Sequence, residues 1–143
     1  YDDKELQFAV RLQQTFEPVP LDDIQRVHDV AGRTGMGSTD VGDVSWIVPT
    51  TGFSTACWVP GTPGHSWQAV ACGGTSIGKK GMLLAAKTLA ATAWDLYQDR
   101  AKIQAARAEF ERRTAGKKYQ SLLNKDQPPP LDYRNAGKRS SGE

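Results

Sequence analysis

The chain is poor in the residues that build metal sites and disulfides, since its 143 residues include only two cysteines and two histidines. Cys57 and Cys72 form no Cys-x-x-Cys unit, so neither a zinc knuckle nor a redox pair is indicated. Nothing resembles a secretory signal, and no uncharged apolar run reaches the roughly 18 residues that a membrane span needs. These absences favour a cytoplasmic protein with reduced thiols and no membrane partner.

Large apolar residues are also scarce. Leu, Ile, Val and Phe together supply 27 of the 143 residues, near the level at which disorder becomes a concern. A net charge of only +2 and four tryptophans argue against disorder. A structured chain with so few large apolar residues is expected to share its core with segments that lie elsewhere. The first residues, 1–4, include no Met, which fits a fragment or a processed chain.

Charge is unevenly distributed along the chain. Residues 1–99 carry seven basic and eleven acidic side chains, whereas residues 100–143 carry eleven basic and five acidic ones. A basic tail can contact nucleic acid or an acidic partner. The charge density is modest, however, and aromatic residues do not alternate with basic ones as RNA stacking would require. A solvated helix face is therefore the favoured interpretation, and no nucleic-acid partner is expected.

Apolar periodicity predicts helices at both ends of the chain. Residues 3–16 have an apolar stripe and acidic residues near their start, and a short helix is expected over 22–30. The longest helix is expected to begin at Thr75 or Ser76 and to continue, with a weaker pattern, to a stop at Gly116. Its apolar positions recur at three- and four-residue spacing: Met82, Leu83, Ala86, Leu89, Ala90, Ala93, Leu96 and Tyr97.

Two short apolar runs predict strands. Residues 44–48 are rich in β-branched side chains and stop at Pro49, and residues 53–59 are bounded by Gly52 and Pro60. Such runs suit strands that are covered on both faces, as in α/β sheets. The expected fold class is therefore α/β. Residues 1–120 are expected to form the folded part, and residues 121–143 an extended or disordered tail.

His65 is the first candidate site residue, in the run Gly61-Thr62-Pro63-Gly64-His65-Ser66-Trp67-Gln68 just beyond a predicted strand. Such loops often carry binding groups because the adjoining sheet fixes their position, and a neutral imidazole is a common metal ligand. A single histidine does not define a metal site. From spacing alone, the alternative is that His65 is an ordinary loop histidine that binds no metal.

A second candidate stretch reads Gly37-Ser38-Thr39-Asp40-Val41-Gly42-Asp43-Val44-Ser45-Trp46. Asp40 and Asp43 could bind a hard cation or act as a base and its orienting partner, and amides of residues 35–38 could receive a substrate carboxylate. The competing interpretation is that Ser38, Thr39 or Asp40 caps a short turn. The glycine-rich run 73–80 superficially resembles a phosphate-binding loop but fails the Walker spacing, so it is interpreted as a helix entry.

The two candidate stretches and the helix Lys80-Gly81-Met82-Leu83-Leu84-Ala85-Ala86-Lys87-Thr88-Leu89-Ala90-Ala91-Thr92-Ala93, taken together and in this order, resemble one family. They are similar to the C-terminal catalytic portion of the B-subunit family of p-aminobenzoyl-glutamate hydrolase. That family is part of the dinuclear metallopeptidase and amidohydrolase group of aminoacylases and glutamate carboxypeptidases. The resemblance covers roughly residues 3–134. It implies a partial three-layer α/β/α catalytic domain with a long C-terminal helix and an irregular tail.

The resemblance also implies a function. It identifies His65 as a metal ligand and the stretch Gly37, Ser38, Thr39, Asp40 and Asp43 as lining the site opposite it. The other ligands of two Zn²⁺ or Mn²⁺ ions, and a general-base glutamate, would lie on the missing N-terminal part of the catalytic domain. Asp40 or Asp43 could orient the His65 ring. The complete protein would be a homodimer or hetero-oligomer that hydrolyses the amide of an acyl- or aroyl-amino acid, and this segment alone would be inactive. The alternative is a non-catalytic interaction module derived from the same fold.

Overall fold

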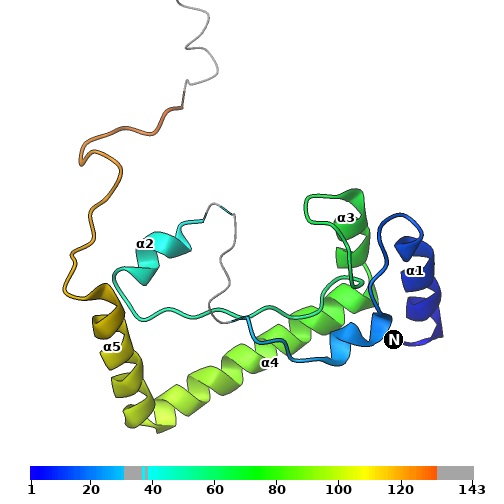
Figure 1. Cartoon of the computed structure of the whole chain (residues 1–143), viewed down its shortest axis with the longest axis horizontal. Helices are drawn as coiled ribbons and strands as arrows, with labels where there is room; N and C mark the ends of the chain where they lie inside the picture. The colour runs from blue at the N-terminus through cyan, green and yellow to red at the C-terminus, as the bar shows by residue number, and fades with distance from the viewer. Residues whose placement is uncertain (31–36, 38, 132–143) are drawn as a thin grey trace, which may run out of the picture.

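The computed structural model describes residues 1–30, 37 and 39–131. These residues form helices joined by irregular segments, and none of them is in a β-strand (Figure 1). The elements, in chain order, are α1 (Asp3–Gln13), the 3-10 helix η1 (Leu21–Gln25), α2 (Val41–Ser45), α3 (Trp67–Gly73), α4 (Ser76–Gln98) and α5 (Arg100–Thr114). The expected α/β class, with its partial three-layer α/β/α domain, is therefore wrong for this chain as described.

Neither predicted strand forms. Residues 41–45 are helical instead, with the Asp40 carbonyl accepting hydrogen bonds from the amides of Asp43 and Val44 at 3.1 and 3.3 Å. Residues 53–59 are irregular and run beside α4 without pairing with another described backbone segment (Figure 1). A strand is stable only when its backbone groups pair with a neighbour, and this part of the chain offers none. A short apolar run does not by itself distinguish a strand from other buried or docked structure.

Helix α1 confirms the prediction of a helix after residue 2, although it ends at Gln13, not at residue 16. Its start is fixed by a capping box, in which the Asp2 carboxylate accepts from the Glu5 amide at 2.9 Å and the Glu5 carboxylate accepts from the Asp2 amide at 2.8 Å. The short helix expected over 22–30 is replaced by η1, which ends at Gln25, so only the first part of that prediction holds.

The predicted long helix is two helices. Helix α4 starts at Ser76 as expected, but Asp99 adopts an extended backbone (φ −126°, ψ 93°) and caps α5 by accepting from the Ala101 amide at 2.9 Å. The direction of the chain changes at this residue (Figure 1). Helix α5 ends at Thr114, and the next two residues, Ala115 and Gly116, both have positive φ. The expected stop at Gly116 is therefore confirmed within one residue.

The core lies where α1, α3 and the first turns of α4 come together (Figure 1). Its buried apolar members come from four parts of the chain, with three partly buried neighbours around them. They are Ala9, Leu12, Val59, Cys72 and Ile77, flanked by Phe8, Phe16 and Leu21. Two glycines let α4 approach this region closely, because a Cβ added at Gly78 would lie 2.8 Å from the Gly73 carbonyl oxygen and one at Gly81 would lie 2.6 Å from that of Ala56.

This core is small for a chain of 143 residues. The accessible surface is 12483 Å², compared with about 7,200 Å² expected for a compact monomer of 15.6 kDa. Large apolar side chains far from the core, such as Leu89 and Trp94, are more than half exposed. The expectation of a thin core is thus confirmed, and much apolar surface remains available for further contacts.

Candidate functional site

His65 lies on the loop that leads into α3, and its side chain is exposed. Its backbone has φ 56°, in the left-handed region that few residues other than glycine adopt, although histidine does so more often than most. Such conformations are found most often at sites where the surrounding structure imposes them. The imidazole forms no hydrogen bond with any residue that the structure describes, so both of its ring nitrogens remain available.

The loop is anchored at its first residues by the core. Val59 is only 1% exposed, and its amide donates to the Cys72 Sγ atom at 3.5 Å. Gly61 follows with φ 84°, and a Cβ there would lie 3.0 Å from the Glu17 carbonyl oxygen and 3.1 Å from the Phe16 ring. A side chain at this position would therefore be both strained and obstructed, which explains the glycine.

Hydroxyl groups fix the remainder of the loop. Thr62 Oγ1 donates to the Val59 carbonyl at 2.7 Å, and Ser66 Oγ donates to the Pro63 carbonyl at 2.7 Å. Ser66 Oγ also accepts from the Ala69 amide at 3.2 Å and so caps α3. His65 directly precedes this cap, so the start of α3 fixes the position of its backbone.

Helix α1 and the turn after it support the loop from the other side. Gln13 Nε2 donates to the carbonyls of Val19 at 2.6 Å and Pro60 at 3.2 Å. Gln68, buried in α3, donates to Thr15 Oγ1 at 3.1 Å. The bonds to Pro60 and Thr15 join segments separated by about fifty positions, so the His65 loop and α1 form one structural unit.

A buried carboxylate ties the same unit to α4. Glu5 is 4% exposed and accepts from Lys80 Nζ at 2.7–2.8 Å and from Ser76 Oγ at 2.5 Å. The hydrogen bonds from Lys80, Ser76 and the Asp2 amide lower the pKa of Glu5 to about 2, and Glu5 in turn raises the pKa of Lys80. The sequence pattern does not reveal this cluster, because a glutamate in the first turn of a helix is usually a solvated residue that interacts with the helix dipole.

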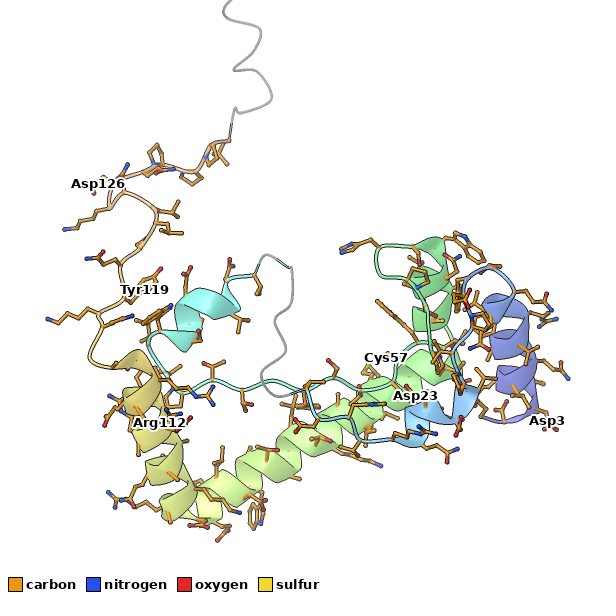
Figure 2. The ribbon with its side chains drawn as sticks, in the orientation of Figure 1. Asp3, Asp23, Cys57, Arg112, Tyr119 and Asp126 are labelled. Atoms are coloured by element: carbon orange, nitrogen blue, oxygen red, sulfur yellow. The ribbon has the colours of Figure 1, made fainter. Side chains whose placement is uncertain are left out.

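The acidic candidates lie in a different part of the molecule. Asp40 immediately precedes α2 and Asp43 lies within it, and α2 is near α5 and away from α3 in Figure 1. The Tyr119 hydroxyl donates to the Asp43 carboxylate, and this bond raises the pKa of Tyr119. Figure 2 shows Tyr119 beside α2, on the segment that follows α5. The structure therefore does not bring Asp40 or Asp43 to His65.

The remaining members of the second candidate stretch are only partly described. Thr39 Oγ1 accepts from the Val41 amide at 3.3 Å, the kind of local turn proposed as the alternative to a binding role. Gly37 is exposed, and a Cβ added there would have nothing within 4 Å, so no close approach requires its glycine. Ser38 and residues 35–36 lie outside the described residues.

Other residues outside the two candidate stretches make structural contacts. The glycine-rich run 73–80 comprises the last residue of α3, the two residues between the helices and the first five residues of α4, which confirms the interpretation as a helix entry. Thr75, at the N-cap position, uses its hydroxyl to donate to the Cys72 carbonyl at 2.6 Å and does not cap the helix with it. His28 lies beyond η1, with Nε2 3.3 Å from the Asp23 carboxylate.

The described residues contain no cluster of three or more His, Cys, Asp or Glu side chains that could hold a metal ion. His65 therefore offers one nitrogen ligand without the companions that a stable site needs. No helix in this part of the chain is long and apolar enough to cross a bilayer. The chain as described presents an exposed imidazole on an anchored loop, and the described residues do not build a metal site by themselves.

Comparison with known proteins identifies a hydrolase subunit as a relative of this chain. The chain is 46% identical over 95 residues to the B-subunit of p-aminobenzoyl-glutamate hydrolase from Escherichia coli, a region that covers 66% of this chain and 20% of that protein. The chain thus spans about a fifth of the length of this relative. No family model matches the sequence, and no solved structure matches it. The likeness to this hydrolase that the three motifs indicate is confirmed, and the chain corresponds to a C-terminal portion of such a protein.

Proposed function

From this likeness we propose that the chain is the C-terminal catalytic segment of a metal-dependent amidohydrolase similar to the B-subunit of p-aminobenzoyl-glutamate hydrolase. Its substrate class would be acyl- or aroyl-amino acids such as p-aminobenzoyl-glutamate. The observation that carries the proposal is the 46% identity over 95 residues, because identity of this level over such a length is specific to related sequences. The exposed, left-handed His65 gives the proposal a definite site residue.

His65 would act as one ligand of a metal pair, either Zn²⁺ or Mn²⁺, and would contribute its neutral imidazole to that site. When bound, the metals would activate a water molecule and polarise the amide carbonyl. The contribution of this chain is to fix the loop that carries the imidazole, through the Val59, Thr62 and Ser66 hydrogen bonds. The remaining ligands and the general-base glutamate would come from the rest of the polypeptide, so the segment alone would be inactive.

The residues from Gly37 to Asp43 would line the substrate side of the completed site. A role for Asp40 or Asp43 in orienting the His65 ring would require α2 to lie against the His65 loop, which it does not in this structure. We therefore do not propose Asp40 or Asp43 as the group that orients the His65 ring. Association with further subunits, as a homodimer or with a second kind of chain, and a cytoplasmic location also belong to this proposal.

The proposal is tested by hydrolysis of p-aminobenzoyl-glutamate by the complete hydrolase-like protein, meaning the full polypeptide of which this chain would be the C-terminal segment. Activity should be lost on chelation and restored by Zn²⁺ or Mn²⁺. The His65→Ala variant should lose at least about 100-fold in kcat/KM, more than the effect of removing a group that only orients a ligand. His28→Ala is the matched control, since it removes the other histidine, which lies beside Asp23.

The results also distinguish the alternatives. Full activity in the chelated protein, or equal activity of the two histidine variants, would contradict the proposed metal-ligand role. A folded protein that neither hydrolyses amides nor binds metal would favour the non-catalytic interaction module. Circular dichroism of each variant confirms that loss of activity does not reflect loss of structure.

A further inference from the structure

An apolar seam runs along the distal part of α4. Its members are spaced alternately by four and three residues, the pattern of side chains on one face of a helix that packs against a neighbour. We call these residues the α4 seam: Met82, Ala86, Leu89, Ala93 and Leu96. Large and small side chains alternate along it, so the two alanines leave recesses between the larger residues.

The α4 seam is largely uncovered by the residues that the structure describes. Met82 and Leu89 are each 59% exposed, and Leu96 is 38% exposed. The buried residues of α4 are Ile77, Gly78 and Gly81, which all lie in its first two turns. Beyond Gly81, α4 extends away from the core (Figure 1). Leu96 borders a hollow that is also lined by residues of α5 and of the segment 45–51, whereas the seam residues before it are exposed in the described chain.

Leu84 shows that exposure alone does not define this surface. It is 55% exposed, nearly the same as Leu89, but the residues at helical spacing from it include Thr88 and Asp95. A lone exposed leucine on a polar face is ordinary in proteins. A continuous apolar row of this length is unusual on an exposed surface, and it usually marks a contact surface.

We propose that the α4 seam is the surface on which the rest of the complete hydrolase-like polypeptide docks. This inference rests on the proposed function, because the partner is the part of the relative that this chain does not match. The matched region is 20% of that protein, so a polypeptide several times longer than this chain is available to cover the seam. The partner surface should be apolar, with large side chains that fit over Ala86 and Ala93.

A second copy of this chain is a poorer occupant. The seam from Met82 to Leu96 spans about two heptads, fewer than the three or four that sustain an isolated coiled coil. The small core of the chain also indicates that it needs additional apolar contacts within a larger folded unit. Self-association is accordingly treated as a competing outcome of the test.

Cysteine accessibility tests the inference without relying on catalysis. Leu89→Cys places a thiol on the α4 seam, and Leu84→Cys places one at a similarly exposed position off the seam. In this chain alone, maleimide should label both cysteines at similar rates, as followed by mass spectrometry of the peptides that contain them. In the complete protein, Leu89→Cys should react at least about ten times more slowly than Leu84→Cys, because the docked surface must open before the thiol can react.

Equal labelling of the two cysteines in the complete protein, whether fast or slow, would overturn the seam as the docking surface. If maleimide labels Leu89→Cys in the isolated chain more slowly as the protein concentration is raised, the chain self-associates through the seam. That result would overturn the proposed occupant. Failure of the proposed function is seen separately: seam protection in a complete protein that does not hydrolyse amides would retain the docking surface and reject the enzyme assignment.

Discussion

Glu5 is the residue whose environment departs most from its sequence context. Its carboxylate is buried among Lys80, Ser76 and the Asp2 amide, and so connects the first turn of α1 to the first two turns of α4. The Lys80 side chain is itself 62% exposed, so the pair lies at the edge of the core and is not wholly removed from water. Glu5 therefore stabilises the unit that anchors the His65 loop without belonging to the site.

Stability should depend on pH through Glu5. Its pKa is lowered from 4.5 to about 2 in the folded chain, so its stabilising contribution is complete above pH 4.5 and is lost as the pH falls toward 2. Urea unfolding of the chain at pH 7, 4.5, 3 and 2 measures this loss. The Glu5→Gln variant should be less stable at pH 7 and should lose less stability than the original chain between pH 4.5 and 2. The same pH dependence in both proteins would show that Glu5 is not responsible.

Gly81 is the residue whose lack of a side chain matters most to packing. A Cβ at this position would lie 2.6 Å from both the Ala56 carbonyl oxygen and the Cys57 Sγ atom. Gly81→Ala should therefore destabilise the chain by about 1–3 kcal/mol, despite the higher helix propensity of alanine.

Gly42→Ala in α2 is the control for this substitution, because nothing lies within 4 Å of its added Cβ. It should be neutral or stabilising by up to about 1 kcal/mol. Urea denaturation of both variants measures the difference. Equal stability of the two would mean that the segment around Ala56 yields easily and that α4 is not held tightly against it.

Among the helices, the boundary between α4 and α5 depends on one side chain. Asp99 leaves the helical conformation and accepts from the Ala101 amide, so it ends one helix and caps the next. Asp99→Ala should weaken the start of α5 by about 1 kcal/mol, whereas Asp99→Asn should retain most of the cap. Hydrogen exchange at the first amides of α5 should be about five times faster in the alanine variant. Unchanged exchange would show that the change of direction at residue 99 has another cause.

The positions of the helices could be predicted from the sequence better than the conformations of the segments between them. The starts of α1 and α4 follow from local signals, which are the acidic residues beside an apolar stripe for α1 and the Thr75–Ser76 pair before an apolar pattern for α4. The capping box at Asp2 is added by the structure. The break at Asp99 could not be predicted, because the helical pattern continues weakly beyond it. The predicted strands are wrong because a short apolar run does not specify a partner strand, and the described chain supplies no strand beside residues 53–59.

At the scale of the whole molecule, the candidate site residues lie in two separate places, the His65 loop and the segment around α2. The importance of the His65 loop could be inferred from its residues and its likeness to a family, and the structure adds the bonds that hold it. Its separation from Asp40 and Asp43 could not be inferred, because that depends on how α2 is placed relative to α3 (Figure 1). The exposed apolar surface and the 20% coverage of the relative both support one proposal: His65 belongs to a site that other segments complete.

The most direct test of this proposal is the metal content of the complete hydrolase-like protein, measured per polypeptide by plasma mass spectrometry after dialysis. The His65→Ala variant should retain its fold but contain fewer bound metal ions, whereas the His28→Ala variant should contain as many as the original protein. Equal metal content in all three proteins would contradict the central claim that His65 is a metal ligand.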